Sequence, residues 1–351
     1  MKVLQVLPAL DSGGVERGTL EIARALVGAG HDSTVLSAGG RLVSRLQRQG
    51  SRHHQWDLGR KSPWTLRHVR PLRRWLAAEA FDIVHLRSRM PAWVTWLAWR
   101  SMDPLTRPRL VTTVHGLHSV SRYSEIVTCG ERVIVVSNAV RDYVITHYPR
   151  CSAQKLHLIY RGIDPREFPR DHRPHEQWLT AWYGEHPQFL EKRVITMAGR
   201  LTRLKGHHDF LQIIKALSAR GDNVHGLIVG GEDPKRRAYA RELYEQVEAD
   251  GLGANISFAG HRSDLRDIYA VSNAVVSLSR QPESFGRTVL EPLSEGVPVV
   301  GYAHGGVAEI LDALYPSGAV PVGDTDAAAD ALHEILAGCA PTPAVNEDFL
   351  L

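Results

Sequence analysis

The chain has 351 residues, of which 43% are hydrophobic and 23% charged, and its formal net charge is +4. This composition is typical of a globular protein, and the length favours two domains over a single core. No run of 18 apolar residues is present, and the first residues lack the apolar stretch and cleavage site of a secretory signal. We therefore expect a cytoplasmic protein without a transmembrane helix.

Cysteine and histidine usage favours neither disulfides nor a metal site. Cys129, Cys151 and Cys339 are scattered, with no CxxC pair and no zinc-site spacing, so we expect free thiols. The 18 histidines include the adjacent pairs 53–54 and 207–208, and adjacent side chains on one element point in different directions. We therefore expect no bound metal ion.

One segment of the chain is strongly basic. Residues Arg41 to Trp75 hold ten Arg or Lys against one Asp, with Trp56 and Trp64 interleaved. A solvated face, an anionic membrane surface or a nucleic-acid site can each produce this pattern. We retain the solvated face and the membrane surface as alternatives, and we expect no nucleic-acid partner.

The first half of the chain alternates apolar strands with amphipathic helices. A strand at 2–10 is followed by glycines and by a helix at 15–31, whose apolar residues lie on one helical face. The alternation then continues. Further strands are expected at 31–39, 83–86, 109–116, 132–137 and 156–164, and further helices at 71–82, 92–102 and 138–148.

The second half repeats this scheme. Strands are expected at 193–201, 224–233, 256–260, 274–279 and 297–306, and helices at 207–221, 237–253 and 264–272. The pattern predicts an α/β fold of two doubly wound, Rossmann-like domains. We place the domains at 1–168 and 192–340, with a linker at 169–191 and a tail at 341–351. Ligands bind such sheets at the carboxyl ends of the strands, so two domains facing across a cleft would hold two ligands.

Two glycines, Gly13 and Gly14, follow the first strand. They open a helix, where free backbone amides attract phosphate or sugar groups. The spacing is not GxGxxG and no acidic residue ends the second strand, which disfavours a nicotinamide dinucleotide. A plain strand-to-helix turn is the alternative interpretation.

Polar residues also follow later strands. Arg200 and Lys205 are five positions apart after the strand at 193–201, so both could reach one anionic group such as a diphosphate. Ordinary solvated loop cations are the alternative. In the first half, His115 stands at a strand end beside Gly116, where a functional role is as plausible as a structural one.

The segment 281–292, QPESFGRTVLEP, carries two glutamates, Glu283 and Glu291. Proline is best tolerated in the first turn of a helix, so Pro292 predicts a helix that begins within a few residues after Gly286. The first amides of that helix form an anion site. The carboxylates could act as a pair of the kind used in glycoside hydrolysis. A helix N-terminus lowers a carboxyl pKa, however, which favours accepting hydrogen bonds from hydroxyls.

Asp324 and Asp326 form a DxD pattern, which also occurs in metal-nucleotide sites. They directly precede an alanine-rich helix, where Asp is a common cap. We therefore interpret these residues as helix caps.

Together these pieces resemble the retaining, nucleotide-sugar-dependent glycosyltransferases with the GT-B fold, glycosyltransferase family 4. The resemblance covers nearly the whole chain, and the spacing of Glu283 and Glu291 is the E-x7-E spacing of that family. The motifs occur in the family's order. They are SGGVER at 12–17, TTVHG at 112–116, VIVVSNAV at 133–140, YRGID at 160–164, GRLTRLKG at 199–206, IVGG at 228–231, FAGHRSDL at 258–265 and ESFGRTVLE at 283–291, followed by EGVPVV at 295–300 and GGVAEIL at 305–311.

The resemblance implies a role for each site residue. Arg200 and Lys205 neutralise the diphosphate leaving group, Glu283 holds the sugar hydroxyls and Glu291 the ribose hydroxyls. His115 lies near the transferred sugar, and with Arg200, Lys205 and Glu283 it forms the expected catalytic set. The other donor-binding positions are Gly13, Gly14, His261, Arg262, Ser284, Phe285, Gly286, Arg287 and Thr288, and the acceptor side has Glu16 and Ser137.

The implied reaction moves a sugar from a UDP-, GDP- or ADP-sugar to a glycan or lipid-linked acceptor, with retention at the anomeric carbon. No metal and no further cofactor are implied. The basic segment suggests an acceptor such as lipopolysaccharide core at the inner face of a bacterial membrane. Alternatives are a nucleotide-sugar epimerase of the same fold and a non-catalytic nucleotide- or membrane-binding module. Family members usually end in a helix that crosses back onto the first domain, and residues 341–351 do not predict one.

Overall fold

The structure, a computed structural model, describes residues 1–11, 13–232, 237–344 and 346–350. Ser12, the first residue of the SGGVER motif, therefore lies outside the described residues, as does Asp233 at the end of an expected strand. The chain divides into two compact units, Met1–Ile159 and Tyr160–Leu351. Each unit is a parallel α/β layer structure, which confirms the predicted fold class.

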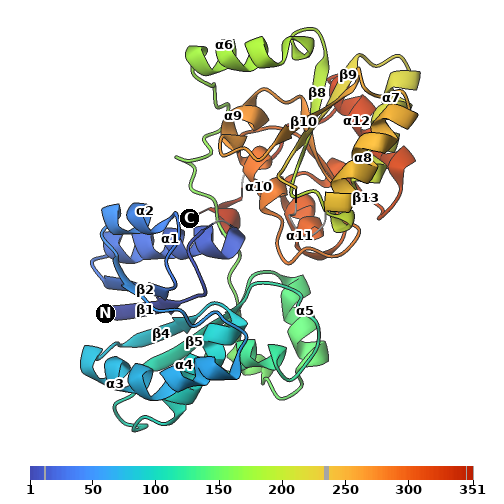
Figure 1. The fold of residues 1–351 in the computed structure, drawn as a ribbon. Coiled ribbons are helices and arrows are strands. Elements are labelled where there is room, and N and C mark those ends of the chain that lie inside the picture. Colours follow the sequence, from blue (N-terminus) through green and yellow to red (C-terminus); the bar gives the residue numbers. More distant parts are fainter. Residues whose placement is uncertain (12, 233–236, 345, 351) are drawn as a thin grey trace. The chain divides into compact units, whose positions relative to one another are not determined.

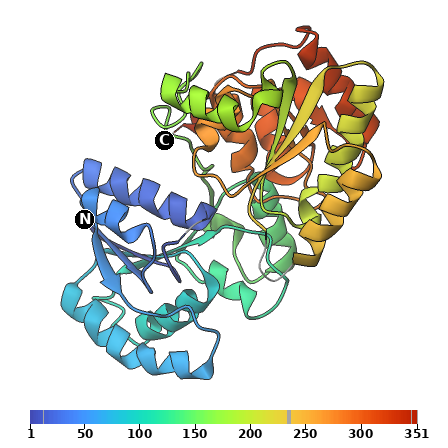
Figure 2. The ribbon, with the colours of Figure 1, turned by 45° about the horizontal axis from the view of Figure 1, so that its top comes forward.

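The first unit is built on a seven-stranded parallel sheet in the order β3-β2-β1-β4-β5-β6-β7. Helices cover both faces, with α1 (Gly14–Gly28) and α2 (Val43–Arg48) on one side and α3 (Val69–Glu79) and α4 (Arg89–Arg100) on the other, as Figure 1 and the turned view of Figure 2 show. The central strands are mostly apolar and are buried on both faces, although they also carry buried polar residues such as Gln5 and His85. The strands are β1 (Lys2–Val6), β2 (Asp32–Ser37), β3 (Arg52–Gln55), β4 (Ile83–Leu86), β5 (Arg109–Val114), β6 (Arg132–Val135) and β7 (Leu156–Leu158).

Helices α1, α3, α4 and α5 (Asn138–His147) correspond to predicted helices, whereas α2, like strand β3, was not predicted. Their caps are local, and Ser137 Oγ, for example, accepts a hydrogen bond from the Val140 backbone N–H at 3.1 Å. The helices are α1 (Gly14–Gly28), α2 (Val43–Arg48), α3 (Val69–Glu79), α4 (Arg89–Arg100) and α5 (Asn138–His147), with 3-10 helices η1 (Pro63–His68), η2 (Ser124–Thr128) and η3 (Ala153–Lys155).

The second unit has a six-stranded parallel sheet in the order β10-β9-β8-β11-β12-β13. Counted from the first strand of each unit, the two sheets have the same strand order, apart from one extra edge strand in the first. The strands are β8 (Arg193–Ala198), β9 (Val224–Val229), β10 (Ile256–Gly260), β11 (Ala274–Ser277), β12 (Val299–Tyr302) and β13 (Ala319–Val320).

Helices of the second unit pack on this sheet, and α7 lies beside α12 (Figure 1). Asp324 Oδ1 accepts a hydrogen bond from the Ala327 backbone N–H at 2.9 Å, so the interpretation of Asp324 as a helix cap is confirmed. The helices are α6 (Glu176–Glu185), α7 (His207–Ala219), α8 (Arg237–Ala249), α9 (Leu265–Ala270), α10 (Arg287–Ser294), α11 (Gly305–Leu314) and α12 (Thr325–Leu336), with 3-10 helices η4 (Pro187–Phe189), η5 (Arg203–Lys205), η6 (Pro316–Gly318) and η7 (Glu347–Phe349).

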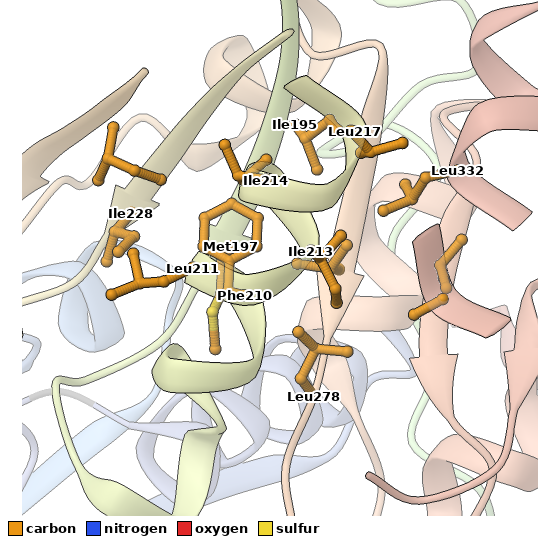
Figure 3. Packing of buried hydrophobic residues seen from close by; sticks show 14 of the residues in the cluster. Ile195, Met197, Phe210, Leu211, Ile213, Ile214, Leu217, Ile228, Leu278 and Leu332 are labelled. Carbon is orange, nitrogen blue, oxygen red and sulfur yellow. The ribbon is translucent and has the colours of Figure 1, made fainter. Parts of the chain in front are cut away.

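The core of the second unit lies between α7, α12 and the sheet. Figure 3 shows Phe210 and Ile213 of α7 packed with Ile195 and Met197 of β8, and all four are almost fully buried. Burial of this apolar cluster holds the strand ends in fixed positions. The loops that follow β8 and β11 therefore start from a rigid base.

The segment expected as a linker is part of the second unit. Helix α6 stacks Trp178 on Trp182, with ring centroids 5.1 Å apart, and Trp182 packs against Phe189, Val194 and other apolar residues of this unit. The division between the units falls at Ile159 and Tyr160, before the expected boundary at residue 168. Tryptophans four positions apart can form one apolar helical stripe, which explains why this proline-containing segment folds.

The basic segment of the first unit divides into a packed part and an exposed part. Trp56 and Trp75 contact each other and His54, with ring centroids of the tryptophans 6.3 Å apart, so these two tryptophans serve packing. Trp64, in contrast, is 75% exposed. Among the described residues no helix is long and apolar enough to cross a membrane. Cys129, Cys151 and Cys339 are free thiols, as expected.

Candidate functional site

Glycines bring the loops at the carboxyl edge of the second sheet into close contact. A Cβ atom at Gly230 would lie 1.8 Å from the carbonyl oxygen of Gly199, and one at Gly206 would lie 2.1 Å from that of Leu278. Gly206 also has a positive φ of 79°, which favours glycine. The segment 199–206 after β8 therefore packs directly against the ends of β9 and β11.

A buried aspartate anchors the same loops from below. Asp209, at the start of α7, accepts hydrogen bonds from Arg280 Nε at 2.9 Å and from the Tyr302 hydroxyl at 2.7 Å. The Arg280 backbone N–H also donates to the Leu204 carbonyl at 2.9 Å. This arrangement joins the loop after β8 to the loop after β11. The sequence did not reveal it, because the partners are far apart in the chain.

Lys205 and Glu283 meet at this edge. Lys205 Nζ lies 2.7 Å from Glu283 Oε1, and the two side chains are 28% and 22% exposed. Ser279 Oγ donates a hydrogen bond to the same carboxylate oxygen. Burial opposes the charge on Glu283, but Lys205, Ser279 and the nearby His304 outweigh it and hold its pKa below the usual range. Glu283 is therefore a charged acceptor.

The loop that carries Glu283 is held against the start of α11. His304 Nε2 donates to the Ser279 carbonyl at 2.6 Å, and the Gly306 backbone N–H donates to the Glu283 carbonyl at 2.8 Å. Sequence reasoning missed Ser279 and His304. The signal was available, because each stands just beyond the end of a buried strand, at the sheet edge where ligands bind.

Helix α10 begins where the sequence predicts. Gly286 is the N-cap residue with a φ of 121°, and Arg287 is the first helical residue. Pro292 stands inside the helix, however, rather than in its first turn. The first-turn amides of a helix have no acceptor within the helix, so the segment from Gly286 to Thr288 provides an anion-attracting end.

Glu291 differs from Glu283 in its surroundings. It is 1% exposed, and its Oε1 lies 3.0 Å from Nε of Arg287, one helical turn earlier. This i,i+4 pair was readable from the sequence and was not predicted. The two glutamates are thus held by different cations, Lys205 and Arg287, rather than facing each other as a matched pair.

The other predicted donor residues lie along the same edge. Arg200 is exposed directly after β8, and the next residue, Leu201, donates its N–H to the Gly231 carbonyl at 3.2 Å. His261 follows β10, and a Cβ atom added at Gly231 would lie 3.5 Å from the Cβ atom of His261. Phe285 is buried and packs against Gly306 at the start of α11, and Ser284 precedes it in the same loop.

The Arg262 side chain points into a contact network of its own. Its guanidinium donates to both oxygens of Asp264, at 2.9 and 2.6 Å, and lies 5.3 Å from the centroid of the Trp182 ring. Asp264 also accepts from the Trp178 indole at 2.8 Å. These contacts join α6 to the end of β10.

In the first unit, the expected turn between β1 and α1 is present. Gly13 has a φ of 137° and is the N-cap of α1, which begins at Gly14. A Cβ at Gly13 would lie 2.7 Å from Glu16 Oε2, so glycine makes room for that carboxylate above the helix start. Below the helix, the buried Arg87 donates to Gln5 Oε1 at 3.0 Å, a cation that sequence reasoning missed.

Two histidines, His115 and His118, stand in the loop after β5. His115 directly follows the strand and is half-buried. His118, three residues later, was not predicted. Burial and the charge of Arg89 lower its pKa to about 4, so it is neutral at physiological pH. The Tyr143 hydroxyl donates to the His118 carbonyl. Ser137, expected on the acceptor side, is fully buried as the N-cap of α5.

The two doubly wound units, each built on a parallel sheet, place the protein in the class of Rossmann-like α/β proteins. Two family models match the chain. Glycosyltransferase Family 4 matches residues 12–167, and Glycosyl transferases group 1 matches residues 181–341. The chain belongs to the glycosyltransferases that these models describe, which confirms the predicted family.

Similar proteins agree with this assignment. A D-inositol 3-phosphate glycosyltransferase from Corynebacterium urealyticum is 35% identical over 73% of this chain and 63% of its own length. A glycosyltransferase structure from Rickettsia africae is 27% identical, with 96% of this chain and 88% of that chain covered and a TM-score of 0.83. Anabaena HepE in complex with UDP is 22% identical, with 97% and 90% covered and a TM-score of 0.77.

These matches confirm the GT-B type of fold predicted from the sequence. The coverage of whole relatives is uneven. The chain spans 64%, 61% and 54% of three further curated relatives and 85% of a fourth. Among residues 1–11, 13–232, 237–344 and 346–350, no group of three or more His, Cys, Asp or Glu is placed to hold a metal ion.

Proposed function

We propose that this chain is a retaining glycosyltransferase that moves a sugar from a nucleotide-sugar donor to a glycan or lipid-linked acceptor. The observation that carries the proposal is the Lys205–Glu283 pair, 2.7 Å apart at the carboxyl edge of the second sheet, beside the N-terminus of α10. A cation, a carboxylate and a helix N-terminus are the groups needed to bind a phosphate-linked sugar. HepE, which shares the fold, was crystallised with UDP.

Stabilisation of the leaving diphosphate is the main catalytic task. As the bond between the anomeric carbon and the phosphate oxygen breaks, negative charge collects on that oxygen. Arg200, Lys205 and the amides from Gly286 to Thr288 would bind the charge as it develops, which is how preorganised groups accelerate a reaction. In this proposal the residues supply enough positive charge that no metal ion is required.

Glu283 and Glu291 would bind the donor and transfer no protons. The lowered pKa of Glu283 keeps it charged, so it can accept hydrogen bonds from the sugar hydroxyls. Glu291 would accept hydrogen bonds from the ribose hydroxyls. The acceptor oxygen then attacks the face from which the diphosphate departs, and its proton passes to the leaving phosphate oxygen. His115 would stand near the transferred sugar.

Replacement of Lys205 tests the proposal most directly. Lys205→Ala should lower turnover about 100- to 1,000-fold, the usual cost of removing one group that stabilises developing charge. Lys215→Ala is the matched control, because Lys215 is 59% exposed on the next helix and pairs with Asp250. Circular dichroism would verify that both variants are folded. A Lys205→Ala enzyme with wild-type turnover would refute the assignment.

The donor can be identified by thermal stabilisation. A specific ligand raises the melting temperature by mass action, so a panel of UDP-, GDP- and ADP-sugars should contain one that stabilises the protein most. Incubation with that donor alone separates transfer from epimerisation. Interconversion of the sugar without an acceptor would favour the epimerase alternative, whereas turnover only with an acceptor supports transfer.

The proposed acceptor is part of the bacterial envelope, such as lipopolysaccharide core, reached from the inner face of the cytoplasmic membrane. The support is the exposed cationic surface of the first unit, which suits anionic lipids. Reversing the charges of Arg67, Arg70 and Arg73 should abolish binding to phosphatidylglycerol vesicles. Reversing Arg132, Arg141 and Arg150, which are also exposed in this unit, should leave most binding intact. Equal loss in both variants would contradict a specific membrane face.

A further inference from the structure

An apolar groove lies in the first unit. Its volume is about 620 Å³, and side chains from η1, α4 and the segment before η2 line it. This volume falls in the range of about 300–1,000 Å³ that is typical of small-molecule sites. The apolar and aromatic lining residues are Pro63, Leu66, Met90, Trp93, Leu97 and Tyr123.

Cations stand at one wall of the groove. Lys61, which lines it, has its Nζ 5.8 Å from the centroid of the Tyr123 ring, and the Arg89 guanidinium lies 5.6 Å from the same centroid. None of the lining residues is acidic. The groove thus combines an apolar interior with positive charge at one side, which is complementary to an anionic amphiphile.

The same wall adjoins the end of β5, where the acceptor is expected. Arg89 Nη1 donates to Ser124 Oγ at 3.3 Å, next to Tyr123, and the Arg89 charge is close enough to His118 to lower its pKa. His118 is three residues from His115. A molecule with its chain in the groove and its charged end at Arg89 would therefore present that end near His118.

The outer rim of the groove is also apolar. Trp64 is 75% exposed and Leu66 is 45% exposed, and both belong to η1 within the basic segment. Exposed aromatic and apolar residues among cations are typical of surfaces that touch a lipid leaflet. A second copy of this chain is a poor occupant, because the ten cations of the segment 41–75 would repel those of the partner.

We propose that this groove binds the hydrocarbon chain of a lipid-linked acceptor, with Lys61 and Arg89 holding the phosphate that joins the chain to the acceptor sugar. The inference rests on the proposed function and specifies its acceptor as a phosphate-linked lipid. The groove would draw the end of the chain out of the membrane and direct the attached sugar toward His115 and His118.

Farnesyl phosphate is a suitable probe, and calorimetry would measure its binding to the full chain. Wild type should bind farnesyl phosphate at least tenfold more tightly than either farnesol or inorganic phosphate, because each of these supplies only half of the recognition. Leu66→Glu places a charge at the groove lip and should weaken binding at least tenfold. Leu105→Glu is the matched control, since Leu105 is 93% exposed and lies outside the groove.

Three results would overturn this inference. They are no binding of farnesyl phosphate to wild type, equal binding by Leu66→Glu, or a change in oligomeric state of Leu66→Glu by sedimentation without a change in lipid binding. Thermal stabilisation by the preferred nucleotide sugar provides the separate readout. It should be the same in wild type, Leu66→Glu and Leu105→Glu. If no nucleotide sugar stabilised any of the three proteins, that result would count against the proposed function and not against the lipid-binding groove.

Discussion

The two units share one strand order but differ at the edge where ligands bind. In the second unit, glycines, a buried aspartate and the Lys205–Glu283 pair fix charged groups in place. In the first unit, the corresponding edge carries two histidines beside an apolar groove and an exposed cationic surface. The comparison shows that a shared strand order leaves the ligand chemistry to the loops after the strands.

Substitution at the close backbone contact in the second unit should give the largest loss of stability. Gly230→Ala would place a methyl group 1.8 Å from the Gly199 carbonyl oxygen, so we expect a loss of about 3 kcal/mol or more in unfolding free energy. Gly231→Ala is the neighbouring control, because its Cβ would meet nothing closer than 3.5 Å, and it should change stability by less than about 0.5 kcal/mol. Urea unfolding would measure both. Similar values for the two variants would contradict the close contact.

The charge on Glu283 should matter for rate more than for folding. Glu283→Gln keeps the side chain's size but removes the charge that faces Lys205, so turnover should fall about 100-fold, while the protein stays folded. Because the pKa of Glu283 lies below its ordinary value of 4.5, this group should not reduce the wild-type rate between pH 7 and pH 5. Steady-state kinetics across that range would check both points. Glu242→Gln provides the control, because Glu242 is an exposed glutamate that pairs with Arg203.

Glu295, another buried glutamate of the second unit, should make the folded protein less stable as the pH rises. Both carboxyl oxygens of Glu295 lack a hydrogen-bond partner among the described residues, and burial raises its pKa to about 9. Between pH 4.5 and 9 the folded state keeps a proton that the unfolded state has released. The free energy of unfolding should therefore fall as pH rises, by at most about 1.4 kcal/mol per pH unit.

Glu295→Gln removes this titration. It should flatten the pH dependence and raise stability at pH 7 by about 2 kcal/mol, with little change near pH 4.5. Thermal denaturation of both proteins from pH 4.5 to 9 would test it. Parallel curves would show that Glu295 is charged in the folded state.

The exposed tryptophan of the first unit should give the smallest effect. Trp64→Ala removes an apolar side chain that is 75% exposed, so folding should be unchanged, while affinity for phosphatidylglycerol vesicles should fall about fivefold, or about 1 kcal/mol. Vesicle sedimentation would measure the change. Leu105→Ala, also on an exposed position, should leave affinity as it is. No difference between the variants would remove Trp64 from the membrane face.

The sequence predicted the fold class and most elements, because apolar periodicity is a local property. The start of α10 after Gly286 was predicted in the same way, from glycine and proline preferences. The prediction that Pro292 lies in the first turn of this helix was wrong, however, because it relied on local preferences alone. The eight-residue helix tolerates this proline in its later turn, close to its end at Ser294.

Contacts between distant residues were the part that could not be predicted. Ser279 and His304 were missed because their roles depend on the loop after β11 meeting the start of α11. The residues expected as a linker fold onto the second unit because Trp178 and Trp182 find apolar partners across the chain. The catalytic, donor-binding and acceptor-side roles of all the predicted site residues remain predictions.

The hydrogen bond from the Gly306 N–H to the Glu283 carbonyl has a consequence for protein engineering. A graft that exchanges only the residues around Glu283 would separate this loop from its hydrogen-bond partners. These partners, His304 and Gly306, belong to the following strand–helix junction. Donor preference should therefore be exchanged between relatives as one cassette, from Ser279 to Gly306. A smaller exchange would change the side chains of the loop but would not carry over the backbone contacts that orient them.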